Sequence, residues 1–448
     1  MLWTDKATKY LNKYWNISEL KDKQIEVINE LLLGHDVIGL LPTGYGKSMC
    51  YIIPPLVTKK IMFIISPLIS LMDEQKNKLI NLGIPCSALH GNNSNKNEEI
   101  QRILDGDIKI IYMSPEYLIK SDGLELARTL IDNNKLGFLA VDESHCISGW
   151  GHDFRPEYTN INKFRQYFPN IPIVAVTATA TTLVCNDIIK LLYLNKPIII
   201  KASFDRPNLF INIKEIPTIS VIKKKKLKEE SMPKENIIKE YINKYVNDKI
   251  IIYINSRKNT EEIAAELNKS NKECCEAYHA GLSKKVRETI QKKFTNGDIK
   301  VIISTIAFGM GIDQIVKCVL IFGFPSSIEE YYQQIGRGGR DGAPCETVLY
   351  FDYSKFKIAK FMLKDFTNYP DLYKVKADNL NKVKNLVYLN TCRRKYILEY
   401  FNEKCSFINC NNCDNCCNQL IEKSKSIVKK DNFEDIDKYE KYEKYLNL

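Results

Sequence analysis

A lysine and a serine at the end of a glycine-containing loop are the residues most clearly equipped for chemistry. The loop reads LPTGYGKS from Leu41 to Ser48, between an apolar run and a helix-prone segment. Backbone amides of such a loop at a helix N-terminus cradle a phosphate, the lysine pairs with the outer phosphate oxygens, and the serine coordinates Mg²⁺. Leu41 replaces the glycine of the simplest motif, and a chance glycine-rich turn is the alternative. We expect nucleotide phosphates to bind Thr43, Gly44, Gly46, Lys47 and Ser48.

An acidic pair about ninety-five residues further along could complete a nucleotide-hydrolysis site. It ends an apolar run in the segment VDESHCISGWGHDFRPEY, Val141–Tyr158. The first carboxylate, Asp142, is placed to hold Mg²⁺ through water, and the second, Glu143, to orient or deprotonate the attacking water. A zinc site is a poor alternative, because His145 and His152 lack both the spacing of a metal-binding helix and a third ligand. We therefore expect the pair to act in hydrolysis.

Two arginines in the second half of the chain could neutralise charge during that reaction. Arg337 and Arg340 lie in QQIGRGGRDG, Gln333–Gly342, where glycines allow close backbone approach. An arginine on a transferring phosphoryl group contributes roughly 10³ to 10⁵ in rate. The alternative is surface pairing with carboxylates such as Asp341. We expect at least one arginine to reach the phosphates, because the other half of a nucleoside-triphosphatase site is already present.

Cysteines near the C-terminus have the spacing of a zinc site. Cys392, Cys410, Cys413 and Cys416 follow the pattern C-x17-C-x2-C-x2-C. Four thiolates hold zinc tetrahedrally, and C-x2-C is a short chelate. Two spare cysteines leave alternative ligand sets open, with Cys417 in place of Cys416 and Cys405 in place of Cys392; six reduced structural cysteines would be the ordinary alternative. Cys50, Cys86, Cys146 and Cys185 are expected to be ordinary core or loop residues.

The elements that must position these residues alternate between short β-branched runs and amphipathic stretches. The runs are apolar at nearly every position, which is typical of strands buried on both faces of a parallel sheet. Expected strands are DVIGLL before Pro42, Ile61–Ser66, Ile108–Met113, a run ending at Asp142, and Ile171–Thr179. A second series contains KIIIYINS, CEAYHA, IKVIIST, VKCVLIFG and ETVLYFD. The fold class is therefore α/β, with two parallel-sheet lobes.

Changes of pattern divide the chain into four parts. Apolar residues at helical spacing follow from Lys355 to Asn402, which predicts helices around the cysteine cluster. The charge-dense segment Ile222–Asn236 is expected to be a solvated linker or loop, with phosphate contact as the alternative. The expected divisions are residues 1–207, 208–352, 353–418 and a charged tail, 419–448.

Composition sets the outer limits on function. The chain has 448 residues, a net charge of +11 and 14 cysteines. The basic balance favours anionic partners such as nucleic acid. No stretch has the length of a signal peptide or a membrane helix, so we expect an intracellular protein that contacts no membrane, in the nucleus or the cytoplasm depending on its source, with most thiols reduced.

The order of these motifs resembles the RecQ family of superfamily 2 DNA helicases. The matching stretches are LLPTGYGKSMCY, SPLISLMDEQ, MSPEYL, DESHCISGWGHDFRPEY, VTATAT, SFDRPNL, IIYINSR, AYHAGLS, STIAFGMGID and YYQQIGRGGRDG, across residues 15 to 417. The resemblance implies two RecA-like lobes, a helical-hairpin zinc module, and ATP, Mg²⁺ and Zn²⁺ as cofactors. It also implies 3′-to-5′ movement on single-stranded DNA, unwinding of tailed duplexes, and a role in DNA repair, recombination or replication.

The segment CISGWGHDFRPEY discriminates best, because it resembles the aromatic-rich loop of RecQ enzymes. The resemblance implies that this loop senses DNA and passes the signal to Glu143. Stacking of an aromatic ring on a base is worth about 1 to 3 kcal/mol and tolerates any sequence, as a translocating motor requires. A loop that merely packs between lobes is the alternative. The residues implied in sensing and coupling are His145, Trp150, His152, Phe154 and Arg155.

The resemblance also implies an adenine site before the phosphate loop. Gln24 matches the glutamine that reads the base edge, whereas Ile17 and Lys21 replace the aromatic residue and the arginine of many relatives. Thr177 and Thr179 resemble the motif that couples hydrolysis to strand movement.

The resemblance also implies that Gly309, Gly311 and Asp313 lie in a motif of the second lobe near the nucleotide and the DNA strand.

After Cys417 only 31 residues remain, so we expect no winged-helix domain and a weaker grip on duplex DNA.

Two rival functions stay open. One is an RNA-directed helicase, which the aromatic loop disfavours. The other is a zinc-containing nucleic-acid-binding or strand-annealing protein whose ATP site only switches conformation. That protein would hold DNA without unwinding it.

Overall fold

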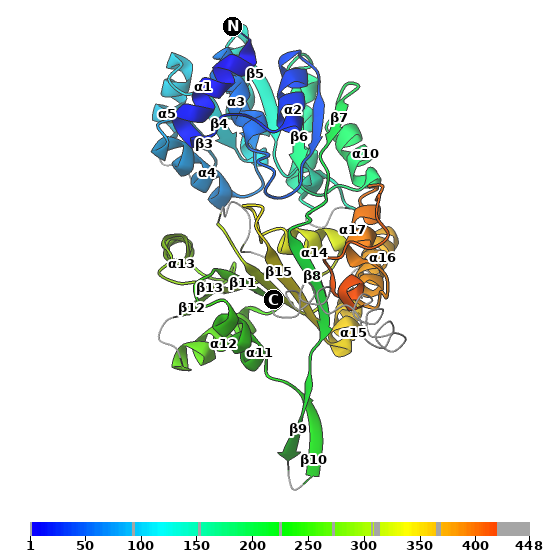
Figure 1. The fold of residues 1–448 in the computed structure, drawn as a ribbon. Helices are drawn as coiled ribbons and strands as arrows, with labels where there is room; N and C mark the ends of the chain where they lie inside the picture. The colour runs from blue at the N-terminus through cyan, green and yellow to red at the C-terminus, as the bar shows by residue number, and fades with distance from the viewer. Residues whose placement is uncertain are drawn as a thin grey trace, which may run out of the picture.

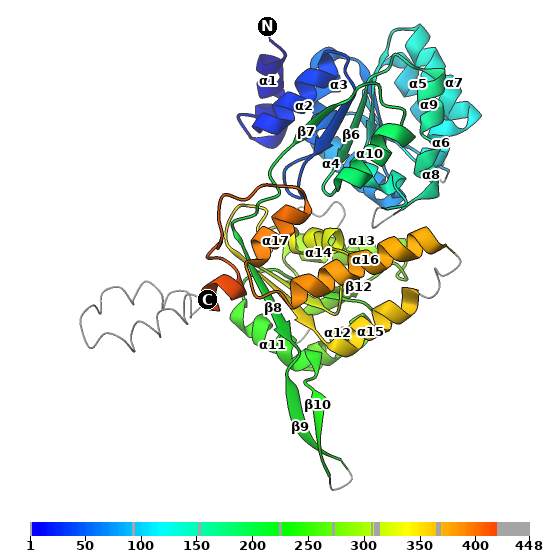
Figure 2. The same cartoon turned by 90° about the vertical axis from the view of Figure 1, so that its right-hand side faces the viewer.

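Two α/β lobes and a helical module make up the part of the chain that the computed structural model describes, residues 2–91, 95–150, 154–223, 226–270, 274–305, 308, 314–363 and 369–418. The lobes lie end to end, and the helical module lies beside the second lobe and reaches the segment that joins the two (Figures 1 and 2). Among the described residues, no helix is both long and apolar enough to span a bilayer.

Lobe 1 is a seven-stranded parallel sheet with helices around it. Its strand order is β3-β4-β2-β5-β6-β1-β7. The strands are β1 (Val37–Leu40), β2 (Ile61–Ile65), β3 (Cys86–Leu89), β4 (Ile110–Met113), β5 (Leu136–Val141), β6 (Ile173–Thr177) and β7 (Ile198–Lys201). The helices are α1 (Trp3–Trp15), α2 (Asp22–Leu32), α3 (Met49–Thr58), α4 (Ile69–Asn81), α5 (Lys96–Asp105), α6 (Pro115–Ile119), α7 (Ser121–Asp132), the 3₁₀ turn η1 (Ser144–Ile147), α8 (Pro156–Thr159), α9 (Asn162–Tyr167) and α10 (Thr182–Leu191).

The strand order of lobe 1 brings the predicted chemistry together. Strands β5, β6 and β1 are neighbours and parallel, so their carboxyl ends meet at one edge of the sheet. The phosphate loop follows β1, Asp142 follows β5, and Thr177 ends β6. Ligands of open α/β sheets bind at this edge. The sequence did not predict β3 or β7, which are only four residues long and close the two edges of the sheet.

Lobe 2 repeats the architecture with a six-stranded parallel sheet of order β12-β13-β11-β14-β15-β8. Its strands are β8 (Leu209–Glu215), β11 (Ile250–Ile254), β12 (Cys275–Tyr278), β13 (Val301–Ser304), β14 (Cys318–Phe322) and β15 (Cys345–Phe351). Its helices are α11 (Lys234–Lys244), α12 (Arg257–Ser270), α13 (Lys284–Asn296) and α14 (Ile328–Ile335). The expected boundary at residues 207 and 208 falls in the segment that joins the two sheets, between Lys201 and Leu209.

The expectation of a linker or loop at Ile222–Asn236 is wrong for most of that segment. Strands β9 (Thr218–Lys223) and β10 (Lys226–Ser231) pair antiparallel, with Lys223 opposite Lys226, and form a hairpin that extends away from lobe 2 (Figure 1). Helix α11 then starts inside the same segment. β-Branched residues such as Ile219 and Val221 favour strand pairing, and the lysine run obscured that preference in the sequence.

The helical module contains α15 (Tyr353–Met362), α16 (Pro370–Val387) and α17 (Arg393–Tyr400), followed by the cysteine-bearing loop. The loop meets lobe 2 through a bridge between Ile211 of β8 and Cys413. Residues 419–448 of the expected tail lie outside the described part of the chain.

Candidate functional site

The phosphate loop has a backbone that requires its glycines. Gly44 and Gly46 have φ angles of +83° and +88°, a region that glycine adopts without strain. A Cβ atom on Gly46 would lie 2.6 Å from Nε2 of Gln24. Ser48 is the N-cap residue of helix α3, so the loop leads directly into the first helical turn. This arrangement can bind a phosphate.

Gln24 braces the phosphate loop in this structure. Its side-chain amide donates to the carbonyls of Tyr45 and Gly46, both at 2.9 Å, and its oxygen accepts from the Lys21 amide at 2.8 Å. The Lys21 ammonium lies 4.7 Å from the centre of the Tyr45 ring, while the Ile17 side chain is exposed. The structure therefore places Lys21 and Gln24 beside the loop. Their roles toward adenine stay predictions.

The acidic pair lies in a buried polar environment. Asp142 accepts a 3.2 Å hydrogen bond from the Tyr51 hydroxyl and a 2.9 Å bond from the Glu143 amide. Burial raises the pKa of Asp142 to about 7, the negative charge of Glu143 adds to the shift, and the Lys47 ammonium opposes it. Glu143 itself has a left-handed backbone, with φ of +46°. The sequence analysis assigned no role to Tyr51, although it ends the quoted stretch LLPTGYGKSMCY.

Asp142 should make the stability of the nucleotide-free chain depend on pH. Its folded pKa lies above the unfolded value of about 4, so the fold favours the protonated form. The free energy of unfolding should then fall as the pH rises from about 4 to about 7, by at most ~1.4 kcal/mol per pH unit, and level off above that. Thermal unfolding without metal or nucleotide should show this slope in the native chain and a weaker one in Asp142→Asn. Equal slopes in the two proteins would contradict the assignment.

A chain of polar contacts leads from Glu143 to lobe 2. The Glu143 carboxylate lies 3.4 Å from Nδ1 of the buried His145, and the same nitrogen is 2.8 Å from the Thr177 hydroxyl. The Thr177 hydroxyl accepts from the Thr179 amide at 3.2 Å. The Thr179 hydroxyl in turn accepts a 3.3 Å bond from the Gln333 side chain, which belongs to helix α14 of lobe 2. The sequence analysis assigned no role to Gln333, the lobe-2 residue at which these contacts end.

The two arginines of lobe 2 take different places. Arg340 faces the phosphate loop, since a Cβ atom on Gly44 would lie 3.5 Å from its Cγ. Arg337 lies beside the buried Tyr253 of β11, where its charge, together with that of Arg340, partly offsets the rise in the Tyr253 pKa that burial causes. A cavity of about 450 Å³ separates the lobes here, and Arg340, Thr43 and Lys21 line it. The structure thus brings Arg340 closer to the expected phosphates than Arg337.

The aromatic-rich segment connects the acidic pair to the SPLISLMDEQ motif of lobe 1. Trp150 is half-buried and packs partly against the core, whereas the Phe154 side chain is 45% exposed. Arg155 donates to the carbonyl of Pro67 at 2.8 Å, just before helix α4. His152 lies outside the described residues, as do Gly309, Gly311 and Asp313. Among the described residues of this segment, Phe154 therefore offers an exposed ring.

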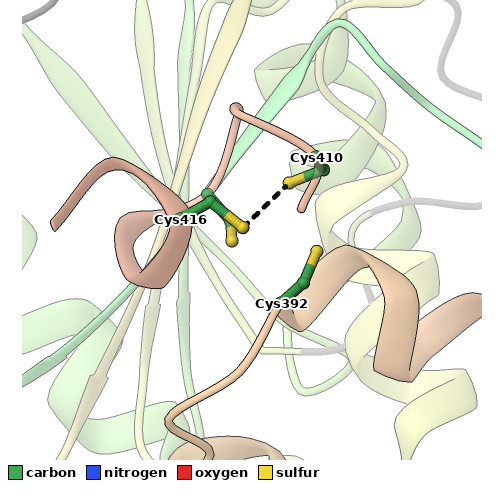
Figure 3. Close-up of side chains that lie close together, drawn as sticks. Cys392, Cys410 and Cys416 are labelled. Carbon is green, nitrogen blue, oxygen red and sulfur yellow. Dashed lines mark hydrogen bonds between the residues drawn. The ribbon is translucent and has the colours of Figure 1, made fainter. Parts of the chain in front are cut away.

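Four of the six C-terminal cysteines converge. The Sγ atoms of Cys392, Cys410, Cys413 and Cys416 all lie within 4.8 Å of one another, three of them buried (Figure 3). The Sγ atoms of Cys410 and Cys416 are 3.9 Å apart, close to the roughly 3.8 Å that tetrahedral Zn–S bonds of ~2.3 Å require.

Backbone amides support two of these sulfurs. The Lys395 amide donates to Cys392 and the Asn412 amide to Cys410, both at 3.4 Å. The spare thiols of Cys405 and Cys417 instead donate to the backbone carbonyls of Glu403 and Asn411. The donor set and spacing fit a structural zinc ion.

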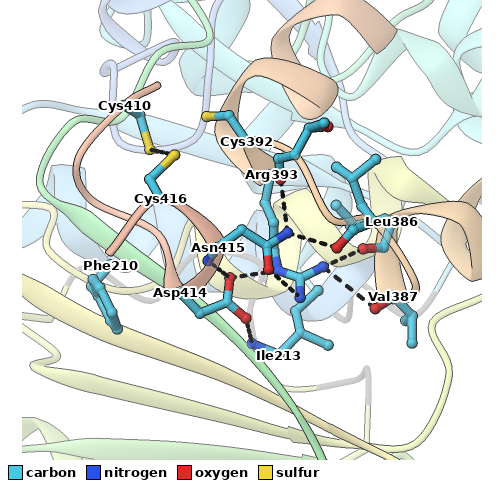
Figure 4. Close-up of polar contacts among 12 residues, drawn as sticks. Phe210, Ile213, Leu386, Val387, Cys392, Arg393, Cys410, Asp414, Asn415 and Cys416 are labelled. Atoms are coloured by element: carbon cyan, nitrogen blue, oxygen red, sulfur yellow. Dashed lines mark hydrogen bonds and ion pairs between the residues drawn. The ribbon is translucent and has the colours of Figure 1, made fainter. Parts of the chain in front are cut away.

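A buried arginine next to the first cysteine ties the module together (Figure 4). Arg393 donates to Asp414 at 2.6 Å, to Asn415 at 3.3 Å, and to the backbone carbonyl of Leu386. Asp414 also accepts from the amide of Ile213 in β8 at 3.0 Å. The cysteine loop, helix α16 and lobe 2 are therefore joined through the Arg393–Asp414 pair. Sequence reasoning assigned no role to Arg393.

Comparison with known proteins agrees with this architecture. Family models match as DEAD/DEAH box helicase over residues 21–188, helicase conserved C-terminal domain over 233–342, and RecQ zinc-binding over 353–417. The structure of Mycobacterium smegmatis helicase Lhr bound to ssDNA and AMP-PNP has a TM-score of 0.61 at 16% identity, covering 82% of this chain and 50% of that one, which shows the shared fold.

Relatives in sequence assign the chain to a narrower family of helicases. The ATP-dependent DNA helicase RecQ of Pasteurella multocida is 36% identical over 89% of this chain and 60% of its own length. A putative ATP-dependent RNA helicase of Acanthamoeba polyphaga mimivirus is 40% identical over 96% of this chain and 75% of its own. Together with the zinc-binding match, these findings show that the chain belongs to the RecQ family of superfamily 2 helicases.

Proposed function

We propose that the protein is an ATP- and Mg²⁺-dependent DNA helicase that moves 3′ to 5′ along single-stranded DNA and unwinds tailed duplexes, within the cell. The observation that carries the proposal is the cleft itself. The phosphate loop and Arg340 of lobe 2 line one cavity, the acidic pair follows strand β5 at the same edge of the lobe-1 sheet, and polar contacts run from Glu143 to helix α14 across the lobes. Roles in DNA repair, recombination or replication belong to the same proposal.

Residues of the phosphate loop, the acidic pair and lobe 2 have separate roles in the proposed hydrolysis. Lys47 pairs with the outer phosphates, Glu143 orients the attacking water, and Arg340 offsets the charge that develops on the γ-phosphoryl group. Oxygen donors suit Mg²⁺, and Ser48 and Asp142 would hold it. When bound, the ion supplies charge neutralisation at the β- and γ-phosphates. Closure on ATP and reopening after hydrolysis then shift the lobes along the strand.

Displacement of a labelled strand from 3′-tailed and 5′-tailed duplexes tests the proposed function. We expect displacement from the 3′-tailed substrate with ATP and Mg²⁺, little from the 5′-tailed one, and none by Lys47→Ala. Binding without displacement would support the annealing alternative. Because one relative is named an RNA helicase, stimulation of ATP hydrolysis by DNA and RNA of equal length should be compared. Stronger stimulation by RNA would overturn the assignment to DNA.

The aromatic loop should couple strand contact to hydrolysis. Trp150→Ala is expected to keep ATP hydrolysis without DNA within about twofold of the native rate, and to lose most of its stimulation by single-stranded DNA, because a stacking surface worth about 1 to 3 kcal/mol is removed. Steady-state hydrolysis with increasing oligonucleotide measures this. Tyr167→Ala removes an exposed ring elsewhere on lobe 1 and serves as the control. Full stimulation of Trp150→Ala would favour a packing role for the loop.

The four converging thiols should hold one zinc ion per chain. Metal analysis of the purified protein is expected to give about one zinc, and Cys413→Ser is expected to lose it and to unfold the module, since metal binding supplies much of the folding free energy of such modules. Cys405→Ser and Cys417→Ser should retain the metal, because both thiols lie outside the cluster. Loss of zinc in either control would show a different ligand set.

A further inference from the structure

The segment that joins the two lobes is held on two opposite sides. It runs through Ser203–Asn208, between the last strand of lobe 1 and the first strand of lobe 2. Side chains at consecutive positions contact different parts of the protein. Asp205 reaches the helical module, and Arg206 reaches the nucleotide cleft. The linker therefore contacts lobe 1, lobe 2 and the module.

On the cleft side, Arg206 bridges the two lobes. Its Nη1 donates to the Thr43 carbonyl of the phosphate loop at 3.1 Å. Its Nη2 donates to the carbonyls of Gly338 and Gly339, both at 2.9 Å, in the loop that carries the two lobe-2 arginines. Asn208 donates to the Gly339 carbonyl as well, at 2.8 Å. One guanidinium group thus fixes the phosphate loop against the backbone directly beside Arg340.

On the module side, two contacts hold the residues just before Arg206. Asp205 forms a bidentate ion pair with Arg394 of helix α17, two residues after the zinc-cluster residue Cys392. The ring of Phe204 stacks on that of Phe401, with centroids 4.5 Å apart and planes 9° apart. These contacts are largely shielded from solvent, because Arg394 is 12% exposed as a side chain. The module therefore constrains the linker where it enters the cleft.

We infer that Arg206 is a positioning residue for ATP hydrolysis, and that the helical module sets its place through the Asp205–Arg394 pair. Arg206 acts on backbone carbonyls and leaves phosphate contact to Lys47 and Arg340. Its task is to hold the Arg340 loop at the correct distance from the phosphate loop. The inference rests on the proposed ATP cleft. Through the Asp205–Arg394 pair, the cysteine-bearing module then affects ATP hydrolysis in a cleft that the module does not itself line.

Kinetics of variants at Arg206 and Arg394 test the inference. Small displacements of a catalytic group can cost about 100-fold in rate, so Arg206→Ala is expected to lower the kcat of DNA-stimulated ATP hydrolysis about 10- to 100-fold. The KM for ATP should stay within about threefold. Arg206→Lys keeps the charge and part of the bonding, and should give an intermediate kcat. Arg394→Ala should lower kcat about 3- to 10-fold at an unchanged KM.

A double variant shows whether both residues act on one path. If the module acts through Arg206, then Arg206→Ala/Arg394→Ala should be no slower than Arg206→Ala alone, because residues of one network are not additive. Lys284→Ala is the matched control. It removes another ion pair between the lobes, formed with Asp73 at 2.7 Å and more exposed, and should change kcat less than twofold. Zinc content and melting temperature report whether each variant is folded.

The outcomes separate this inference from the proposed function. DNA-stimulated hydrolysis by the native chain tests the proposed function, and its absence would remove both. With the native chain active, an unchanged kcat in Arg206→Ala overturns the inference alone. A raised KM at constant kcat would overturn it too, because Arg206 would then bind ATP directly. If the loss of kcat in the double variant equalled the product of the two single losses, the module would act independently of Arg206, and the inferred route would be wrong. Should Arg206→Ala fail to fold, the intermediate kcat expected of Arg206→Lys decides.

Discussion

Glu143→Gln is expected to lower the kcat of ATP hydrolysis by roughly 10² to 10⁴ while leaving the KM for ATP within about threefold. The amide keeps the size of the side chain and loses the carboxylate that orients and deprotonates the attacking water. The structure places that carboxylate next to Asp142 and 3.4 Å from Nδ1 of His145. Steady-state hydrolysis with saturating single-stranded DNA, together with binding of a fluorescent ATP analogue, separates the loss of chemistry from loss of affinity.

Glu157→Gln provides the matched control for this variant. Glu157 lies in α8, is exposed, and belongs to the same segment of lobe 1. It should hydrolyse ATP at the native rate. A Glu143→Gln protein with more than a tenth of the native kcat would show that another group positions the water, and would remove the role assigned to the chain of contacts through His145 and Thr177.

Arg340→Ala is expected to reduce kcat by roughly 10³ or more, the scale of a lost arginine finger. Arg337→Ala should cost less, because Arg337 lies beside Tyr253 in lobe 2, whereas Arg340 packs against Gly44 of the phosphate loop. Each variant serves as the control for the other, because both remove one positive charge from the same loop at sites three residues apart. Single-turnover hydrolysis is the suitable measurement, because it isolates the chemical step from product release.

An equal loss in the two variants would mean that both arginines act on the phosphates after closure. A larger loss in Arg337→Ala would contradict the order that the structure gives. If Arg340→Ala instead raised the KM and kept kcat, its guanidinium would contribute to ATP binding without stabilising the transition state.

The parts of the site that local patterns encode could be predicted from the sequence. The phosphate loop, the acidic pair and the C-x2-C-x2-C run are short, and their chemistry depends on residues close in sequence. Runs such as KIIIYINS predicted buried parallel strands, because side chains covered on both faces must all be apolar. The family match and the two parallel sheets confirm the α/β fold and the RecQ resemblance.

Contacts between distant segments could not be predicted in this way. The Tyr51 hydroxyl reaches Asp142 across 91 positions, and Gln333 reaches Thr179 across 154. Nothing in either local sequence marks the pairing, since any polar residue in the right place could make it. Gln24 is a related case: the resemblance implies contact with adenine, which stays a prediction, while the contacts of its amide with the phosphate loop could not be predicted from the sequence. The segment SFDRPNL was part of the resemblance, yet the role of Arg206 emerged only once both lobes were placed.

The proposed hydrolysis takes place in a cleft that both lobes complete. A structure of the protein with single-stranded DNA, Mg²⁺ and ADP–aluminium fluoride tests this directly, because the fluoride marks the position of the transferred phosphoryl group. We predict that the Arg340 guanidinium lies within hydrogen-bonding distance, about 2.7 to 3.1 Å, of that group, with Glu143 on its water. Guanidinium groups of Arg337 and Arg340 that both point away from the fluoride, with no other lobe-2 cation in reach, would contradict the account.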